Sequence, residues 1–200
     1  ITTGDWSSDV CSSDLGLSIL RVQDNFVTQW GDPNEDDPVE HSAKSLGTAA
    51  ATLPAEFTRP IDPKLAWTPL PDGDTYAPEV GFSDGFPAAR DPATNETWLA
   101  HCYGMVGVAR DTGPETGNGS ALYAVIGQAP RRLDRNLAVA GRVIEGMPLL
   151  AGLPRGAPPM GFYAAPAQRI SIQSLRLAST LPAAEQPRIE VLRTDSPSFA

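Results

Sequence analysis

Short apolar runs separated by polar residues are the clearest pattern in this sequence. Leu17–Val22 and Phe26–Trp30 are two such runs, and the polar triplet Gln23–Asn25 lies between them. Short runs with polar breaks are typical of β-strands, so this region predicts two strands or one bent strand. Further strands are expected at Met105–Arg110, Ala121–Gly127 and Leu137–Val143.

The C-terminal part adds one helix and two strands to the prediction. Val143–Leu153 has apolar residues at helical spacing, although Pro148 requires a kink or a break within it. Arg169–Ala178 alternates as a strand does, and Pro187–Arg193 shows a weaker strand pattern. Many short strands with one or two helices favour a closed or nearly closed β structure.

The stretch Pro33–Thr97 has a different character from the rest of the chain. Half of the chain's 20 prolines lie in it, together with an acidic cluster and a run of small residues. Because this is too long for an ordinary connection, we expect a loop-rich insertion at about residues 33–97 that lies on the surface. One short strand is expected within it, at Phe57–Pro60.

The opening stretch Ile1–Leu15 is rich in serine and aspartate and has no apolar period. It lacks the basic start and apolar run of a targeting peptide. A flexible acidic leader is one interpretation. The other, which we favour, is that Asp5–Leu15 resembles a translated sequencing-library adapter. Residues 1–15 are then a non-native leader, and residues 16–200 form one domain whose natural N-terminus is missing.

Charge and cysteine content narrow the classes of function. The formal net charge is −9, and it stays negative, at −6, when Asp5, Asp9 and Asp14 are set aside. An acidic chain is not typical of a nucleic-acid binder, which needs a basic face. Without Cys11 in the leader, Cys102 stands alone and no disulfide can form within the chain. No apolar run approaches the length of a membrane span, and a monomer is expected.

Metal and nucleophile sites find little support in the residues. The two histidines, His41 and His101, make a poor metal set with Cys102, since His101 and Cys102 are adjacent and would point to opposite sides of a strand. His101 is therefore predicted to be a structural histidine. No serine lies in a nucleophile-elbow pattern, and the glycine-rich stretch 112–120 lacks the ending of a phosphate-binding P-loop. We expect no metal and no cofactor.

Arg21 is the most unusual residue in the apolar runs. It lies inside Ser18–Val22, where a guanidinium is costly unless it is paired or functional. Phe26, Gln29 and Asp32 follow closely in the sequence. From spacing alone, an arginine at a strand edge that pairs with Asp32 and a functional arginine both remain open.

Three blocks of sequence, in the same order, resemble the signatures of the cyclophilins. Leu20–Pro33 resembles the pattern in which a catalytic arginine precedes Phe-x-x-Gln-x-Gly-Asp. Gly104–Gly127 resembles the second signature, which has a Met-Ala-Asn strand followed by a Gly-Pro-x-Thr-Asn-Gly-Ser turn. Arg131–Met147 resembles the third, Trp-Leu-Asp-Gly-x-x-Val-x-Phe-Gly. The resemblance implies a mainly β fold, an eight-stranded antiparallel β-barrel with few helices, here without its N-terminal strands and helix.

The resemblance also implies peptidyl-prolyl cis–trans isomerase activity on proline-containing polypeptides, in the service of protein folding. Arg21 falls on the catalytic arginine, and Gln29 on the glutamine that binds the substrate backbone. Several positions depart from the family, because Arg132 stands where many members have tryptophan and Arg110 where they have asparagine. The implied substrate-binding residues are Phe26, Val27, Gln29, Ala109, Arg110, Tyr123, Leu133 and Leu137.

The departures keep a second function open, a non-catalytic binder of proline-containing segments that uses the same groove. The missing N-terminal segment would leave unpaired strand edges, so the chain taken alone is expected to be a poor enzyme. A bacterial periplasmic or cell-envelope location is favoured over the cytoplasm.

Overall fold

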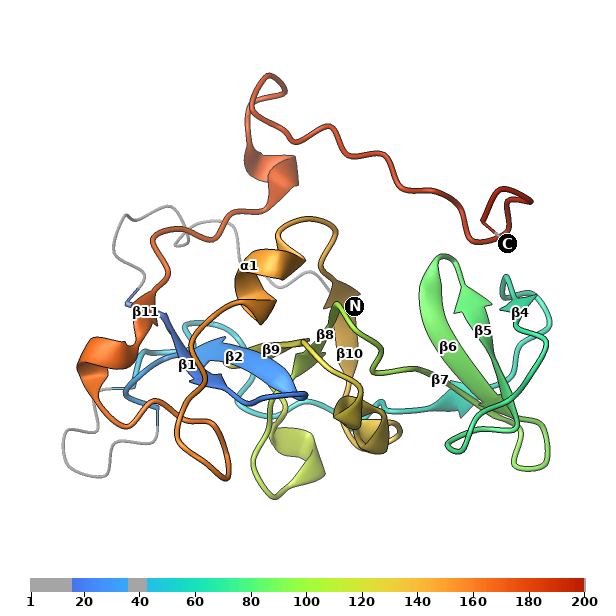
Figure 1. Cartoon of the computed structure of the whole chain (residues 1–200), viewed down its shortest axis with the longest axis horizontal. Helices are drawn as coiled ribbons and strands as arrows, with labels where there is room; N and C mark the ends of the chain where they lie inside the picture. The colour runs from blue at the N-terminus through green and yellow to red at the C-terminus, as the bar shows by residue number, and fades with distance from the viewer. Residues whose placement is uncertain (1–15, 36–42, 200) are drawn as a thin grey trace.

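The computed structural model describes residues 16–35 and 43–199, so the adapter-like stretch 1–15 and His41 lie outside the described residues. The described part contains eleven strands, one short α-helix and four 3-10 helices (Figure 1). All strand pairs are antiparallel. The expected mainly β architecture with few helices is therefore confirmed.

Six strands form the first sheet, in the order β10-β8-β9-β2-β1-β11. Some neighbours in this sheet are distant in the sequence, since β2 pairs with β9 and β1 with β11. The predicted strands of the three signature blocks thus lie side by side in one layer. The bounds are β1 Ser18–Val22, β2 Val27–Gly31, β8 Met105–Val108, β9 Leu122–Val125, β10 Val139–Arg142 and β11 Ile170–Ser171.

The polar triplet Gln23–Asn25 is the turn of a hairpin between β1 and β2. The Gln23 amide donates to the Val27 carbonyl at 2.9 Å, and the Phe26 amide donates to the Gln23 carbonyl at 3.1 Å. Asn25 has a positive φ of 51°, a conformation that asparagine tolerates better than most residues. The two apolar runs are therefore two strands, one of the two arrangements that the sequence left open.

The second sheet has five strands, in the order β3-β7-β6-β5-β4. Its strands are drawn almost entirely from residues 33–97, where the sequence predicted only one short strand, at Phe57–Pro60, and most of the other described residues of that stretch are loop. Alanine, glycine and proline fill several of its strand positions, so the stretch lacks the apolar alternation that identifies a strand. The bounds are β3 Arg59–Pro60, β4 Thr68–Pro69, β5 Glu79–Ser83, β6 Phe86–Asp91 and β7 Glu96–Leu99.

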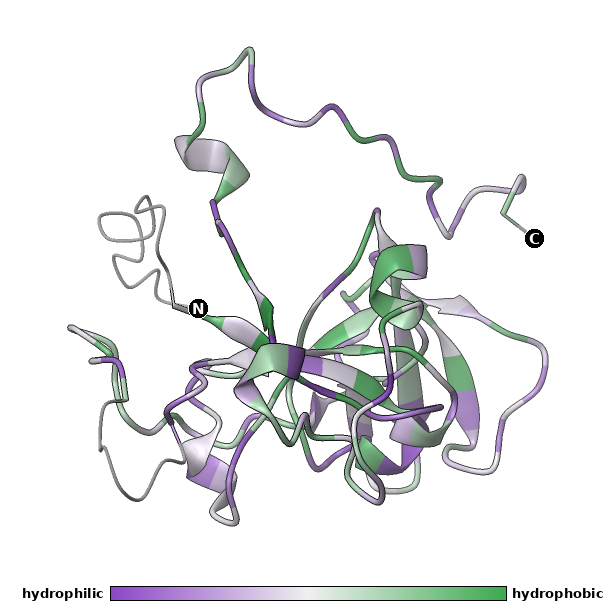
Figure 2. Cartoon of the chain, turned by 60° about the vertical axis from the view of Figure 1, so that its left-hand side comes forward, coloured by the Kyte–Doolittle hydropathy of each residue, from purple (hydrophilic) through white to green (hydrophobic). Residues whose placement is uncertain are grey.

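The main core lies on the first sheet, around strands β2, β8 and β9. Colouring by hydropathy shows hydrophobic residues on the short helix and along much of the strands, whereas the C-terminal segment alternates between hydrophobic and hydrophilic residues (Figure 2). A separate cluster of Ala77, Ala89 and Trp98 forms the core of the second sheet. Phe86 of β6 packs against the first core, so the two sheets share apolar contact.

The helix α1, Met147–Ala151, is shorter than predicted and begins one residue before the proline rather than kinking around it. Pro148 lies in its first turn, where the missing amide hydrogen has no intrahelical partner to lose. No helix in residues 16–35 and 43–199 has the length and hydropathy to cross a membrane.

The C-terminal strands are mostly absent in the described chain. Only Ile170–Ser171 of the predicted Arg169–Ala178 strand forms β11, and Pro187–Arg193 is not a strand. The partner strand β1 begins at Ser18, so beyond Ile172 no described strand lies alongside to complete a ladder. The segment after β11 runs across the molecule (Figure 1), and Phe199 packs edge-on against Phe82 of β5 at 5.1 Å.

Candidate active site

Arg21 lies on β1 at an irregularity of the sheet. The pairing of β1 with β2 shifts register between Ile19 and Arg21, after which Arg21 stands directly opposite Gln29. An extra residue in one strand re-aims the side chains that follow it. Because residues opposite each other in an antiparallel pair share a face, the two side chains that the signature implies are brought together.

Neutral oxygen atoms surround the Arg21 guanidinium. Its Nε donates to the Met160 carbonyl at 2.6 Å, and Nη1 donates to Gln29 Oε1 at 3.2 Å. Nη2 donates to the Gln23 side chain. Burial, and then the positive charge of Arg132, lower the pKa of Arg21 from its usual value. The alternative in which Arg21 pairs with Asp32 is wrong, because Asp32 instead accepts from the amides of Asn34 and Lys44.

Aromatic rings lie against the same guanidinium. Arg21 Cζ is 5.4 Å from the ring centroid of Phe26 and 5.2 Å from that of Phe162. Arg132 Cζ also lies close to the Phe26 ring, 4.8 Å from its centroid. Phe162, at 42% exposure, stands open to solvent whereas Phe26 is buried. Among the described residues, Phe26 is therefore the one aromatic ring that lies close to both arginines.

The apolar residues predicted for substrate binding form one cluster. Phe26, Val27 and Tyr123 are buried in it together with Met105 and Val125. The cluster extends from the hairpin turn across β2, β8 and β9 to the 3-10 helix Ala129–Leu133. Three further predicted residues pack against it from its margin, namely Ala109, Leu133 and Leu137.

Tyr123 is held at its hydroxyl by a histidine. His101 Nε2 lies 2.8 Å from Tyr123 Oη, and the two rings stack with centroids 6.1 Å apart. Burial, with a further contribution from the charge of Asp134, raises the pKa of Tyr123 well above its usual value, so the phenol stays neutral. His101 is fully buried, as its prediction as a structural histidine requires, and it fixes the position of a predicted pocket residue.

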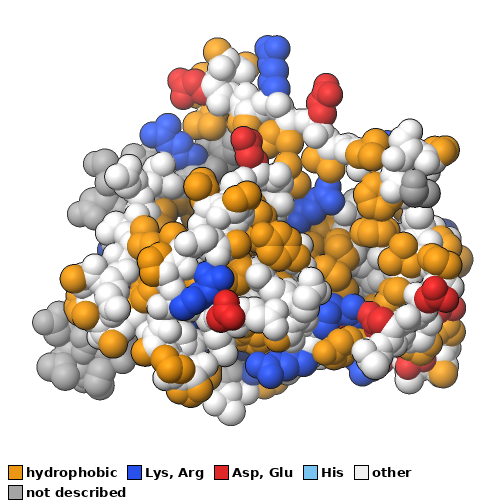
Figure 3. Space-filling view, in the orientation of Figure 1, with side chains coloured by type: hydrophobic (Ala, Val, Ile, Leu, Met, Phe, Trp, Pro, Cys, Tyr) orange, Lys and Arg blue, Asp and Glu red, His pale blue; other side chains and the backbone are white. Residues whose placement is uncertain are grey.

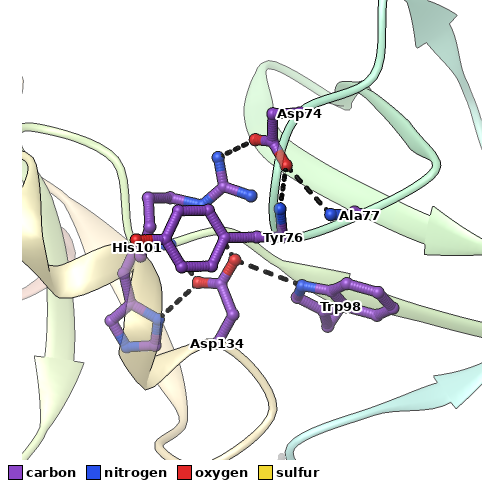
Figure 4. Close-up of polar contacts among 7 residues, drawn as sticks. Asp74, Tyr76, Ala77, Trp98, His101 and Asp134 are labelled. Atoms are coloured by element: carbon purple, nitrogen blue, oxygen red, sulfur yellow. Dashed lines mark hydrogen bonds and ion pairs between the residues drawn. The ribbon is translucent and has the colours of Figure 1, made fainter.

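Asp134 anchors this arrangement from below (Figure 4). Its Oδ1 accepts from the His101 amide at 2.8 Å and lies 3.0 Å from His101 Nδ1. Its Oδ2 accepts from Trp98 Nε1 at 3.3 Å and from Arg131 Nε at 2.9 Å. Burial opposes the charged carboxylate, but the hydrogen bonds from His101 and Arg131 outweigh it and lower the pKa of Asp134.

Arg110 closes the far side of the cluster. Its Nη2 donates to Asn136 Oδ1 at 2.7 Å, its Nη1 donates to the Asp111 carbonyl at 2.7 Å, and its guanidinium lies 5.8 Å from the Phe57 ring. Phe57 belongs to the segment between the two sheets, and the Leu53 amide donates to the Glu115 carbonyl at 2.9 Å. The segment 51–57 therefore lies beside the β8–β9 end of the site.

Sequence reasoning missed several residues of this site. Gln23, Met160 and Phe162 all contact Arg21, and Asp134 holds His101. Met160 is 139 positions from Arg21, and no periodicity connects residues so far apart. Asp134 carried a signal, because it lies in the third signature block, but its partner His101 lies outside that block.

The described residues contain no group of three or more His, Cys, Asp and Glu side chains that could hold a metal ion. The groups gathered at the site are the partly buried guanidinium of Arg21, the amide side chains of Gln23 and Gln29, and an apolar pocket. A preorganised donor in an apolar site stabilises charge that develops on a bound group.

An antiparallel β-protein that holds one partly buried arginine over the ring of an apolar pocket is an arrangement of the prolyl isomerase kind. The chain belongs to the cyclophilins: the family model "Cyclophilin type peptidyl-prolyl cis-trans isomerase/CLD" matches residues 12–177. The family catalyses peptidyl-prolyl isomerisation, so the expected class of enzyme is confirmed. None of the curated proteins matches this chain.

A solved structure supports the same assignment. The crystal structure of cyclophilin AquaCyp293 from Hirschia baltica is similar to this chain, with a TM-score of 0.71 and 26% sequence identity. The similarity covers 92% of this chain and 67% of that one. The resemblance to cyclophilins is thus not confined to the three sequence blocks, since the structural similarity covers 92% of the chain.

Proposed function

We propose that Arg21 and the apolar cluster around Phe26 are where this chain carries out the peptidyl-prolyl isomerisation of its family. The observation that carries the proposal is the position of the Arg21 guanidinium, which is 5.4 Å from the Phe26 ring and hydrogen-bonded only to neutral oxygens among the described residues. Its charge is thus not neutralised by a neighbouring carboxylate there.

To accelerate this reaction, an enzyme must stabilise the twisted amide of the X–Pro bond. Rotation about a peptide bond has a barrier of about 18–20 kcal/mol because resonance is lost. As the X–Pro bond twists, its nitrogen regains a lone pair that can accept a hydrogen bond. A guanidinium N–H of Arg21 donates to that lone pair only in the twisted state, and such differential stabilisation is what accelerates a reaction.

The apolar pocket orients the proline of the substrate. Phe26, Val27 and Tyr123 are buried apolar surfaces on which a proline ring packs. Gln29 accepts from Arg21 through Oε1, which leaves its side-chain amide hydrogens to donate to the carbonyl that precedes proline. Leu133 and Leu137 complete the wall. The apolar residues thus hold the proline ring, and Gln29 fixes the carbonyl side.

Substitution of Arg21 tests the assignment. We expect Arg21→Ala to lower kcat/KM by about 100-fold, the size of effect seen when one transition-state donor is removed. Arg21→Lys should also be weak, because a point charge does not reproduce the planar guanidinium. NMR exchange spectroscopy on an X–Pro peptide measures the rate without a coupling enzyme. Arg176→Ala, which removes an exposed arginine, is the matched control, and near-normal turnover in Arg21→Ala would refute the assignment.

The second candidate function is a non-catalytic binder of proline-containing segments. The observation in its favour is the charged side chain of Arg132 against the proline pocket, 4.8 Å from the Phe26 ring. A binder would show line broadening and a dissociation constant for the peptide, with no gain in cis–trans exchange over the uncatalysed rate. The same NMR experiment therefore separates the two functions.

The remaining partner assignments are also proposals. The chain acts on proline-containing polypeptides as a monomer and not on nucleic acid, since its net charge is −9. Basic side chains are scattered singly over the face shown in Figure 3 instead of forming a stripe. Light scattering of the purified protein tests the monomer, and cell fractionation tests the periplasmic or envelope location.

A further inference from the structure

Two positive charges flank the ring of Phe26. Arg21 Cζ is 5.4 Å from its centroid and Arg132 Cζ is 4.8 Å from it, so the two guanidinium carbons lie at most about 10 Å apart. The charge of Arg132 acts on the site, since it contributes to lowering the pKa of Arg21. Arg132 is exposed, so its guanidinium is accessible to a bound peptide.

Carboxylates do not balance these charges in the described part of the chain. The arginines on either side of Arg132 have acidic partners there, because Arg131 pairs with Asp74 and Asp134 and Arg135 lies 3.9 Å from Glu96. Arg132 forms no ion pair with a described carboxylate, and Arg21 has only neutral acceptors among those residues.

This local excess of positive charge stands out in a chain whose net charge is −9. Acidic residues are abundant, yet two that lie close to these arginines in the sequence are engaged elsewhere, since Asp24 pairs with Arg155 and Asp134 accepts from His101 and Arg131. Uncompensated charge at a binding site raises the local concentration of ligands of the opposite sign.

We propose that Arg132, acting beside Arg21, makes this enzyme select proline-containing segments that carry an aspartate or glutamate within one or two residues of the proline. The proposal rests on the proposed function, since it assumes that the proline ring packs on Phe26. Consecutive Cα atoms are about 3.8 Å apart. A side chain on a residue next to the bound proline therefore reaches a guanidinium that lies 4.8 Å from the Phe26 ring.

The geometry separates the roles of the two arginines. Arg21 is fixed by three hydrogen bonds and faces the rotating bond. Arg132 lies at the end of the 3-10 helix Ala129–Leu133, held by the ring that it covers. Its long, solvent-exposed stem lets the guanidinium follow a carboxylate on either side of the proline, so that charge rather than shape is recognised.

Peptides that differ in one charge test the selection. Three series carry Glu, Gln or Lys immediately before the proline, immediately after it, or two residues after it. NMR exchange gives kcat/KM for each peptide. We expect the protein to prefer Glu over Gln at one or more positions by about fivefold, which is the size that one solvent-accessible ion pair supplies. Raising the NaCl concentration from 0.05 to 0.5 M should shrink that ratio.

Substitutions test whether Arg132 is the residue that causes the preference for Glu peptides. In Arg132→Gln the Glu and Gln peptides should react equally, and in Arg132→Glu the Lys peptide should become the better substrate. Arg135→Gln is the matched control, because it removes the same charge from a neighbouring exposed arginine that lies over Trp98, 4.8 Å away, and not over Phe26. The control should keep the full Glu preference.

The outcomes distinguish this proposal from the proposed function. Equal rates for the Glu and Gln peptides in the unmodified protein, with clear catalysis of both, would overturn the selection and leave the isomerase intact. An equal loss of preference in Arg132→Gln and Arg135→Gln would overturn it as well, by showing a general effect of net charge. Catalysis of no peptide would contradict the proposed function itself. The salt dependence of the Glu preference is measured on the unmodified protein. It therefore tests whether the preference is electrostatic even if Arg132→Gln does not fold.

Discussion

The buried carboxylate of Asp134 joins parts of the chain that are far apart in sequence, and its replacement by the isosteric amide is the most informative single change. It receives donors from Trp98 of β7, from both the backbone and the ring of His101, and from Arg131 of the adjacent 3-10 helix. Asp134→Asn keeps the shape of the side chain but removes its charge. The amide group places two hydrogens where a carboxylate oxygen accepted.

The loss of stability expected in Asp134→Asn follows from the number of hydrogen-bond donors left without an acceptor. One carboxamide oxygen can satisfy two of the four donors, so about two charge-assisted hydrogen bonds are lost, at roughly 1.5–3 kcal/mol each. The side chain of Asp134 is 5% exposed, which places it with buried pairs, whose disruption costs about 3–5 kcal/mol. For a chain of 200 residues this lowers the melting temperature on the order of 10 °C.

The lowered pKa of Asp134 also predicts how its contribution to stability changes with pH. The pKa of Asp134 is lowered in the folded protein, whereas an unfolded aspartate titrates near about 3.9. Its stabilising contribution is therefore fully present above about pH 4 and is lost as the pH falls through the folded pKa. The difference in unfolding free energy between the unmodified protein and Asp134→Asn should be constant near neutral pH and should shrink in acid.

Urea denaturation at several pH values, followed by tryptophan fluorescence, measures this difference. Asp195→Asn is the matched control, because Asp195 pairs with Arg193 in an exposed position near the C-terminus, and we expect no measurable change there. A loss in Asp134→Asn that matched the exposed control, or one that stayed constant down to pH 3, would show that the carboxylate does not anchor the second sheet to the site.

Two further substitutions test the packing of the pocket. Tyr123→Phe leaves His101 Nε2 without its partner at 2.8 Å, and this should cost about 1–3 kcal/mol of stability. We expect kcat/KM to stay within about twofold, because the ring is retained. A large loss of activity would give the hydroxyl a role in catalysis. Gly107→Ala places a Cβ within the ring of Tyr123 and should cost about 1–3 kcal/mol through overpacking and raise KM for prolyl peptides. A fully stable Gly107→Ala with unchanged KM would contradict the position of that ring.

The β1–β2 hairpin was predictable because its signals are local. The apolar runs, the polar turn and the residues Arg21, Phe26 and Gln29 all lie within 14 consecutive residues of one signature block, and the structure places them together. The predicted pocket residues Tyr123 and Leu137 followed from the resemblance of the later blocks. Their contact with Phe26 could not be derived from any local pattern.

The second sheet could not be predicted for the opposite reason. Positions such as Gly81, Pro87 and Ala88 have low strand propensity, and the sheet forms because Val80 and Trp98 pack with Ala77 and Ala89. Tertiary packing there overrides the composition of the segment. At the C-terminus the sequence predicted more strand than the structure contains. A strand needs a hydrogen-bonded neighbour, and the described chain offers one only at Ile170–Ser171.

The strand order of the first sheet sets the order in which the enzyme can assemble. Ser18 pairs with Ser171, and Val27 with Val125, so the sheet that carries Arg21 requires almost the whole chain, and pairings of such high contact order form slowly. The strands β5, β6 and β7 pair with their nearest neighbours in sequence and can close while synthesis continues. Once folded, that segment shortens the effective loop between β2 and β8 and lowers the entropy that later pairing must overcome. On the ribosome, Arg21 is therefore among the first of these residues to emerge, and its surroundings are among the last to be completed.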